Sequence, residues 1–173
     1  MINKERIKFL NDRSIQQREC VVYWMQASQR SECNHALEYA IVRANELKKP
    51  LIVFFGITDC YLEAGERQYY FMLEGLQEVE ASLAKRGIRM VVIPVSPEKG
   101  VVKLSQGACL VVVDAGYLKI QKQWRARAAE LLDCPLVQVE TDVLVPVEEA
   151  SGKEEYAAVT LRPKIHKKLY QYL

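Results

Sequence analysis

The chain has 173 residues, of which 50% are hydrophobic, and its formal net charge is +2 at pH 7. The length suits one domain of ordinary size, and the hydrophobic content is ample for a buried core. A net charge this small gives little general attraction for nucleic acid, although basic residues gather at both ends of the chain. No run approaches the roughly 18 apolar residues that a membrane span needs, and the charged N-terminus is unlike a signal peptide.

The five cysteines are odd in number and form no C-x-x-C pair. This pattern argues against a disulfide framework and a zinc site, so we expect free thiols in a reducing compartment, by default the cytoplasm. The two histidines, His35 and His166, have no evident Ser, Cys or Asp partner, so a nucleophilic triad has little support. Cys33 precedes a predicted helix, but without a partner it is better interpreted as an inert thiol.

The chain opens with a pattern that predicts a short amphipathic helix over residues 3–12. A continuous apolar run then predicts the first strand, over 20–25, and a polar turn over 26–32 follows it. A helix over 35–49 comes next, because its apolar residues fall on one face. Proline ends that helix, and the second strand is predicted over 51–55.

After a loop over 56–65 the same alternation continues. The predicted elements are a helix over 66–86, a strand over 90–93, a helix over 97–105, a strand over 109–113, a helix over 121–132 and a strand over 136–139. Strands that alternate with helices indicate a parallel α/β sheet, and continuous apolar strands indicate that both of its faces are covered. We therefore expect an α/β fold with a doubly wound, five-stranded parallel sheet, Rossmann-like, with helices on both faces. The periodicity weakens beyond 139, and 161–173 predicts a basic helical tail.

Function is expected at the carboxyl ends of the strands, where open parallel sheets bind ligands beside the switch in strand order. The strands over 20–25 and 109–113 should end side by side. The turns after them, 26–30 and 115–119, should then form two walls of a crevice. Neither turn carries a G-x-G-x-x-G fingerprint or a G-x-x-x-x-G-K-[ST] phosphate loop, so a nucleotide is not indicated by a motif.

Five residues of these strand ends and turns are candidates for cofactor binding: Met25, Gln26, Arg30, Asp114 and Tyr117. Their mixture of apolar and polar groups suits a flat ring system with a polyol or phosphate tail. Asp114 can equally well cap the turn that follows it, and Arg30 can pair with Glu32 instead of a ligand. No residue set predicts a metal site. The residues alone therefore indicate a cytosolic α/β domain with a small-ligand site at its strand ends.

Three stretches of the chain follow known motifs: VVYWMQASQRSECNHALEYA, ERQYYFMLEGLQEVEASLAKRGI, and the tail over 145–165. They resemble the Y-W-M tripeptide with its D-Q-R-x-x-D-N-W-A-L turn, the R-x-Y-x-F-M-L-x-G-L-x-E-V helix, and the V-P-V…R-P-K-I run of class II cyclobutane-pyrimidine-dimer photolyases. The resemblance covers essentially the whole chain, in the right order. Ser28 and Cys33 stand where that family has Asp, and His35 stands where it has Trp.

The resemblance implies the N-terminal α/β antenna domain of such an enzyme over 1–150, and over 151–173 a basic helical tail leading towards a C-terminal, FAD-binding helical domain. It implies that light-driven repair, a carbon–carbon lyase reaction on damaged DNA, belongs to that second domain. The present chain would be non-catalytic alone and would meet DNA only through that partner. It implies for this chain an antenna chromophore, a hydroxy-deazaflavin or a flavin. Because the departures at Ser28 and around Gly116 fall at the predicted crevice, we expect weak or absent binding.

Two other hypotheses stay open. A stand-alone, non-catalytic module of the same fold would use the crevice for a nucleotide or flavin-like ligand, or its tail for a protein partner. A hydrolase that uses Cys33 or His35 has the least support. The tail carries apolar and aromatic residues, among them Tyr156, Tyr170 and Tyr172, so we expect some of them to pack on the sheet domain or on another copy of the chain.

Overall fold

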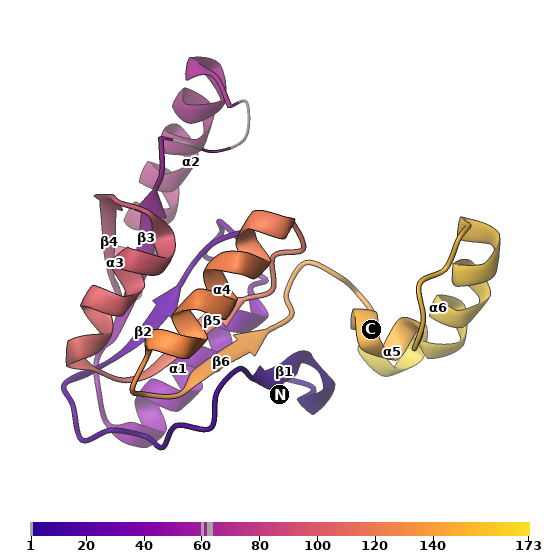
Figure 1. Cartoon of the computed structure of the whole chain (residues 1–173), viewed down its shortest axis with the longest axis horizontal. Coiled ribbons are helices and arrows are strands. Elements are labelled where there is room, and N and C mark those ends of the chain that lie inside the picture. The colour runs from indigo at the N-terminus through magenta and orange to yellow at the C-terminus, as the bar shows by residue number, and fades with distance from the viewer. Residues whose placement is uncertain (1, 60, 62–63) are drawn as a thin grey trace.

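The computed structural model describes residues 2–59, 61 and 64–173. Its centre is a six-stranded sheet with the order β1-β6-β5-β2-β3-β4 (Figure 1). The strands are β1 (Ile7–Phe9), β2 (Cys20–Trp24), β3 (Leu51–Ile57), β4 (Arg89–Pro94), β5 (Ala108–Asp114) and β6 (Leu136–Val139). Strands β2 to β6 are mutually parallel, and the order reverses between β2 and β5. The doubly wound parallel sheet predicted from the sequence is thus confirmed.

Helices cover both faces of this sheet (Figure 1). They are α1 (His35–Leu47), α2 (Glu66–Lys85), α3 (Pro97–Leu104) and α4 (Lys119–Leu131), followed by α5 (Val147–Ala150) and α6 (Ala158–Tyr172) beyond the sheet. Tyr23 packs in one core cluster with residues of α1 and α2, whereas Trp24 packs in a second cluster with residues of α3 and α4. Neighbouring strand positions face opposite sides, and both rings are fully buried. Among the described helices, none is long and apolar enough to cross a membrane.

The N-terminal segment differs from the helix predicted over 3–12. A 3-10 turn, Lys4–Arg6, leads into β1, which runs antiparallel to β6 and adds a sixth strand. Backbone pairing with the otherwise open edge of the sheet outweighs the weak amphipathic pattern of a short segment. The buried guanidinium of Arg6 donates hydrogen bonds to the carbonyl oxygens of Val143 at 2.9 Å and of Leu144 at 2.5 Å, so it fixes the chain where it leaves β6.

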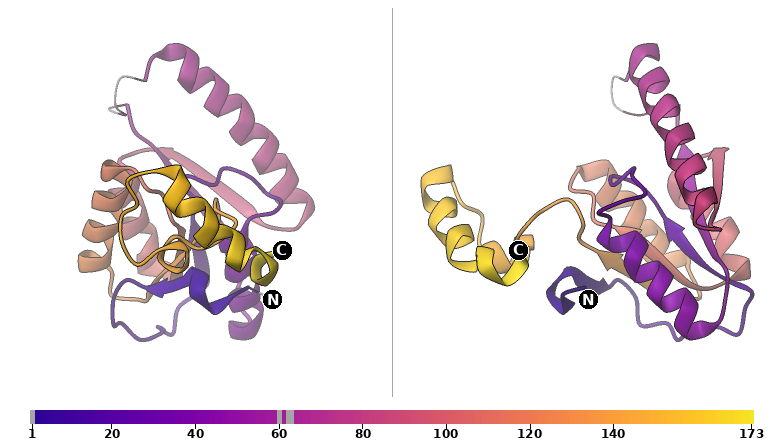
Figure 2. Two further views of the ribbon diagram at one scale, coloured as in Figure 1. Left: turned by 90° about the vertical axis from the view of Figure 1, so that its right-hand side faces the viewer. Right: turned by 180° about the vertical axis from the view of Figure 1, so that it is seen from behind.

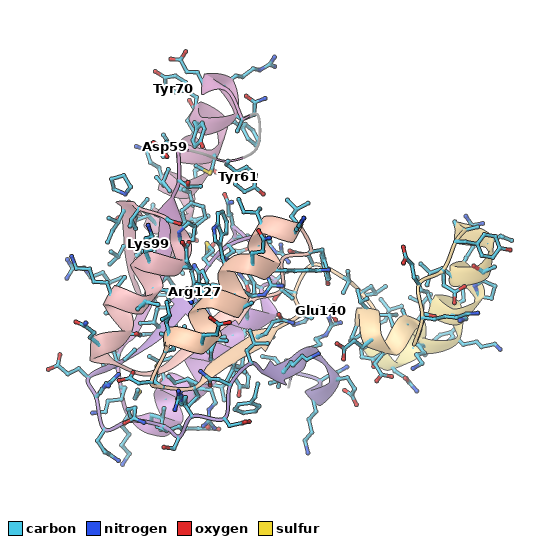
Figure 3. All side chains as sticks on the ribbon, viewed as in Figure 1. Asp59, Tyr61, Tyr70, Lys99, Arg127 and Glu140 are labelled. Atoms are coloured by element: carbon cyan, nitrogen blue, oxygen red, sulfur yellow. The ribbon has the colours of Figure 1, made fainter. Side chains whose placement is uncertain are left out.

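Helix α2 projects beyond the end of the sheet in its N-terminal half (Figure 1). Leu76, Val79 and Leu83 of its apolar face are buried, but Leu73 is 41% exposed because it lies on the projecting half. Tyr70, labelled in Figure 3, lies further out and is also exposed. The helix therefore has one half packed on strand β4 and one half that stands over the carboxyl edge of the sheet.

The arm formed by α5 and α6 stands away from the sheet (Figure 2). An ion pair between Lys168 and Glu149, at 2.6 Å, joins its two helices. Tyr172 contacts the body of the domain, since the guanidinium of Arg6 lies 5.5 Å from the centre of its ring. Tyr170, by contrast, is 95% exposed, so only part of the aromatic tail packs on the domain as expected.

Candidate ligand-binding site

A cavity of about 1170 Å³ opens at the carboxyl ends of β2 and β3. Its walls come from the turn after β2, the end of β3, the face of α2 and the start of α4. The larger apolar and aromatic residues of this lining include Met25, Phe55, Tyr61, Tyr69, Met72 and Trp124. Aromatic walls with a few polar groups are the usual lining of a small-molecule site. The crevice predicted at this edge of the sheet is therefore present.

Two aromatic rings close the cavity between the loop after β3 and helix α4. Tyr61 lies on that loop, as Figure 3 shows, and Trp124 lies on α4. Their ring centres are 6.1 Å apart at an angle of 41°, within the range of favourable aromatic pairs. The ring of Trp124 both packs against the core and lines the cavity.

Asp114 shapes the turn that follows β2. Trp24 and Val113 are paired across β2 and β5, so the two strands end together as predicted. The carboxylate of Asp114 accepts hydrogen bonds from the backbone N–H groups of Gln26 at 3.0 Å and Ser28 at 2.5 Å. The residue is completely buried and is absent from the cavity lining. Asp114 thus caps the turn after the neighbouring strand β2. It does not cap the turn 115–117 that follows its own strand, which was the alternative considered from the sequence.

Burial raises the pKa of Asp114 to about 6, and the N–H groups of Ser28 and Gln26 oppose this shift only in part. The carboxylate of Asp142 raises the pKa further. The hydroxyl of Tyr23 lies 3.5 Å from Asp114, and its own pKa is raised, chiefly by burial. The interior beneath the turn therefore holds a titratable carboxyl group whose charge is poorly solvated.

Asn34 fixes the other end of the same turn. Its Oδ1 accepts the N–H of Leu37 at 3.0 Å and so caps α1, as a side chain at this position commonly does. Its Nδ2 donates to the carbonyl oxygens of Ser28 and Arg30, each at 3.0 Å. Asp114 and Asn34 together satisfy the backbone of the turn from within, which fixes the positions of the residues that line the cavity.

Arg30 lines the cavity and forms an ion pair with Asp142 at 2.6 Å, not with Glu32 as considered from the sequence. Both side chains of the pair are partly exposed, at 40% and 30%. A pair with this exposure contributes roughly 0–1 kcal/mol, so an anionic ligand group can replace Asp142 at little cost.

Tyr117 lines the opposite side of the cavity from the turn after β5. Its hydroxyl donates to Glu140 Oε1 at 2.7 Å. Burial is the largest cause that raises the pKa of Tyr117, and the contact with Glu140 is the second. The other oxygen of Glu140 accepts the N–H of Val147 at the start of α5. Figure 3 shows Glu140 where the chain leaves the sheet for the arm. The site is therefore connected to the segment that carries the arm.

Four of the five predicted residues line the cavity, namely Met25, Gln26, Arg30 and Tyr117. The wall formed by the end of β3 and by α2 was missed. Its signals were present, since the strand run stays apolar through Ile57 and the first turns of α2 carry Tyr69, Phe71 and Met72.

The cysteines of the described residues are free thiols. Cys20, Cys109 and Cys134 are buried and Cys33 is exposed, whereas Cys60 lies outside the described residues. Within the same part of the chain, His, Cys, Asp and Glu form no cluster of three or more that could hold a metal ion.

The sequence is similar to curated proteins named deoxyribodipyrimidine photo-lyase. It is 52% identical over 174 residues to the deoxyribodipyrimidine photo-lyase of Methanothermobacter thermautotrophicus, a match that covers 100% of this chain and 39% of that protein. It is 36% identical over 177 residues to the deoxyribodipyrimidine photo-lyase of Potorous tridactylus, covering 99% of this chain and 33% of that protein. The chain thus spans between 33% and 39% of the length of these two relatives.

Solved structures agree on the fold. An archaeal photolyase from Sulfolobus tokodaii, solved with two FAD molecules and implicating a novel light-harvesting cofactor, superposes with a TM-score of 0.72 at 19% identity, over 86% of this chain and 35% of that chain. A bacterial class III photolyase from Agrobacterium tumefaciens gives a TM-score of 0.60 at 22% identity, over 76% of this chain and 28% of that chain. The family model described as DNA photolyase matches residues 21–173. The chain therefore belongs to the DNA photolyase family, of which it represents the N-terminal α/β domain.

Proposed function

We propose that this chain binds a light-harvesting chromophore in the cavity at the ends of β2 and β3, as the antenna domain of a class II-type photolyase. The observation that carries the proposal is the cavity itself, about 1170 Å³ in volume and lined by aromatic rings together with Gln26 and Arg30. The class II subtype is supported by the Y-W-M tripeptide over 23–25, by the helix over 66–79 and by the tail over 145–165, which follow that class's motifs.

The proposed chromophore is a hydroxy-deazaflavin or a flavin. Rings such as Tyr61 and Trp124 offer faces for a flat heteroaromatic system, and Arg30 offers a positive charge for a phosphate or polyol tail. The two FAD molecules of the Sulfolobus tokodaii photolyase support a flavin. When bound, such a group absorbs light and passes the excitation through space. The residues of this chain only hold and orient it, and we propose that they do so weakly.

In the whole enzyme, we propose, residues 1–150 form the antenna unit and 151–173 the tail towards a C-terminal FAD-binding domain. Light-driven carbon–carbon lyase chemistry on damaged DNA belongs to that domain, and the present chain alone does not repair DNA. The exposed side chains of Tyr156 and Tyr170 on the arm support a docking role towards that domain, with a second copy of the chain as the alternative occupant. The free thiols support a cytoplasmic location.

Fluorescence titration of the chain with 8-hydroxy-5-deazaflavin, FMN and methenyltetrahydrofolate tests the proposal. Gly75 lines the cavity on α2, and a Cβ built there meets no atom within 4 Å. The Gly75→Phe variant should therefore place a ring in the cavity without a clash at its Cβ and weaken chromophore binding by about tenfold or more, since it takes up part of the volume beside α2. Glu80→Phe adds the same side chain to an exposed position of α2 outside the lining and serves as the control.

The proposal fails if none of the three compounds binds the wild-type chain. It also fails if Gly75→Phe and Glu80→Phe bind the chromophore equally well, because the ligand would then lie elsewhere.

A further inference from the structure

We infer that Gln26 selects the ligand by recognising one edge of the ligand's ring system. Its side-chain amide pairs with a heterocycle that presents a ring N–H beside a carbonyl group, as the pyrimidinedione edge of a flavin or a deazaflavin does. This inference rests on the proposed function and adds to it the chemistry by which the ligand is recognised.

The side-chain amide of Gln26 is unused by the fold. The residue lines the cavity and is only 7% exposed. Its Nε2 and Oε1 are themselves buried and have no hydrogen-bond partner among the described residues, so the amide must turn about its side-chain bonds to pair with a ligand. The other glutamines of the lining differ from it. Gln29 donates to the carbonyl oxygen of Gln26 at 3.2 Å, Gln68 accepts from Gly65 at 3.1 Å, and Gln121 accepts from Leu118 at 3.2 Å. Within the described lining, Gln26 therefore stands apart as the glutamine with both amide atoms unpaired.

The backbone of Gln26, in contrast, is held firmly. Its N–H donates to both carboxylate oxygens of Asp114, at 3.0 and 3.2 Å, and its carbonyl oxygen accepts from Gln29. Most buried polar groups in proteins have partners, and a buried amide without one lowers stability. A buried amide without partners on a fixed backbone gains hydrogen bonds when a ligand edge reaches it, and this gain is what the inference assigns to Gln26.

The chemistry of the amide specifies the edge that it recognises. Nε2 donates hydrogen bonds and Oε1 accepts them, so a planar partner must offer an acceptor and a donor side by side. A ring carbonyl next to a ring N–H satisfies both atoms in the plane of the amide. Met25 adjoins Gln26 in the lining and contributes an apolar surface for the face of the ring. Methylation of the ring nitrogen removes the donor and places a methyl group against Oε1, which should prevent the pairing.

Riboflavin and N3-methylriboflavin differ at this one group and provide the test. Fluorescence quenching on the wild-type chain should show riboflavin binding about tenfold or more tightly. Gln26→Met keeps the length of the side chain and should reduce the ratio of the two affinities to about one, because methionine offers neither donor nor acceptor. Gln77→Met, on an exposed part of α2 outside the cavity lining, should keep the wild-type ratio.

The comparison of two flavins on the wild-type chain needs no variant, so misfolding cannot imitate its result. Equal affinities there overturn the inference and leave the proposed function standing. A preference that persists in Gln26→Met also overturns it, since another group would then distinguish the two flavins. Tighter binding of adenosine than of riboflavin overturns the assigned ring edge. Absence of binding by either flavin overturns the inference, and the proposed function as well if hydroxy-deazaflavin and methenyltetrahydrofolate also fail to bind.

Discussion

The Asp114→Asn variant removes the charge from the residue that shapes the turn after β2 and keeps the shape of its side chain. The carboxyl group is completely buried, and its pKa in the folded chain is about 6, raised from 3.8. The folded state therefore holds the proton more tightly than the unfolded chain does. The contribution of Asp114 to stability is thus greatest at low pH and is lost as the pH rises through about 6.

The size of this effect follows from the displacement of the pKa. Roughly two pH units at about 1.36 kcal/mol each correspond to about 3 kcal/mol in total. About half of this loss develops below pH 5, where the unfolded chain ionises first, and about 1–1.5 kcal/mol develops between pH 5 and pH 7.5. The free energy of unfolding of the wild type, measured relative to Asp114→Asn, should therefore fall by about 1–1.5 kcal/mol over this range. Asparagine does not titrate, so its altered contacts with Gln26 and Ser28 add only a constant offset.

Urea denaturation of both proteins at pH 5, 6 and 7.5, followed by tryptophan fluorescence, measures this difference. Other titrating groups largely cancel because they are common to both chains. A difference that does not change with pH would contradict the argument. A wild type that gains stability over the variant as the pH rises would show that the N–H groups of Gln26 and Ser28 outweigh burial.

Three further substitutions test other features of the fold. Gln26→Met should raise the free energy of unfolding by about 1–2 kcal/mol in urea denaturation, because an apolar side chain replaces a buried, unpaired amide. Gly56→Ala should lower it by about 1–3 kcal/mol in the same assay, since a Cβ there would lie 2.8 Å from the Cα of Pro97. Arg6→Ala should lower it by about 2–4 kcal/mol and should speed proteolysis between β6 and α5, because the guanidinium holds the carbonyl oxygen of Val143 at 2.9 Å. Arg6→Lys should restore only part of the loss, and equal proteolysis of all three proteins would contradict the role of Arg6.

The elements between β2 and β6 were predictable because each carries its own local signal. Buried parallel strands are continuous apolar runs, and the helices between them show one apolar face with clear ends, such as the cap at Asn34 and the proline after α1. The parallel order and the meeting of β2 and β5 then follow from the rules of crossover connections. The N-terminal strand β1 lacks such a signal, because its conformation depends on pairing with β6 at the far end of the domain.

The site was predictable in position but only partly in detail. The carboxyl ends of β2 and β5 marked the edge of the sheet, and the turns there supplied Gln26, Arg30 and Tyr117. Whether Asp114 meets a ligand or caps a turn depends on where the N–H groups of a turn from another strand lie, and no local pattern encodes that. The position of α2 over the cavity is likewise set by packing of its C-terminal half, which leaves the first half free to form a wall.

In the turn after β2, the backbone atoms that give the turn its stability are distinct from the side chains that line the cavity. Asp114 and Asn34 bind the backbone of the turn, so the loop conformation does not depend on the side chains that face the cavity. The amide of Gln26 stays unpaired, so it can gain a partner when a ligand enters. Arg30 forms only a partly exposed ion pair, so it can exchange Asp142 for a ligand group. A site built this way loses little of its shape when a lining residue changes. Divergence of the lining, and of its ligand, can therefore proceed on a fixed scaffold so long as Asp114 and Asn34 are kept.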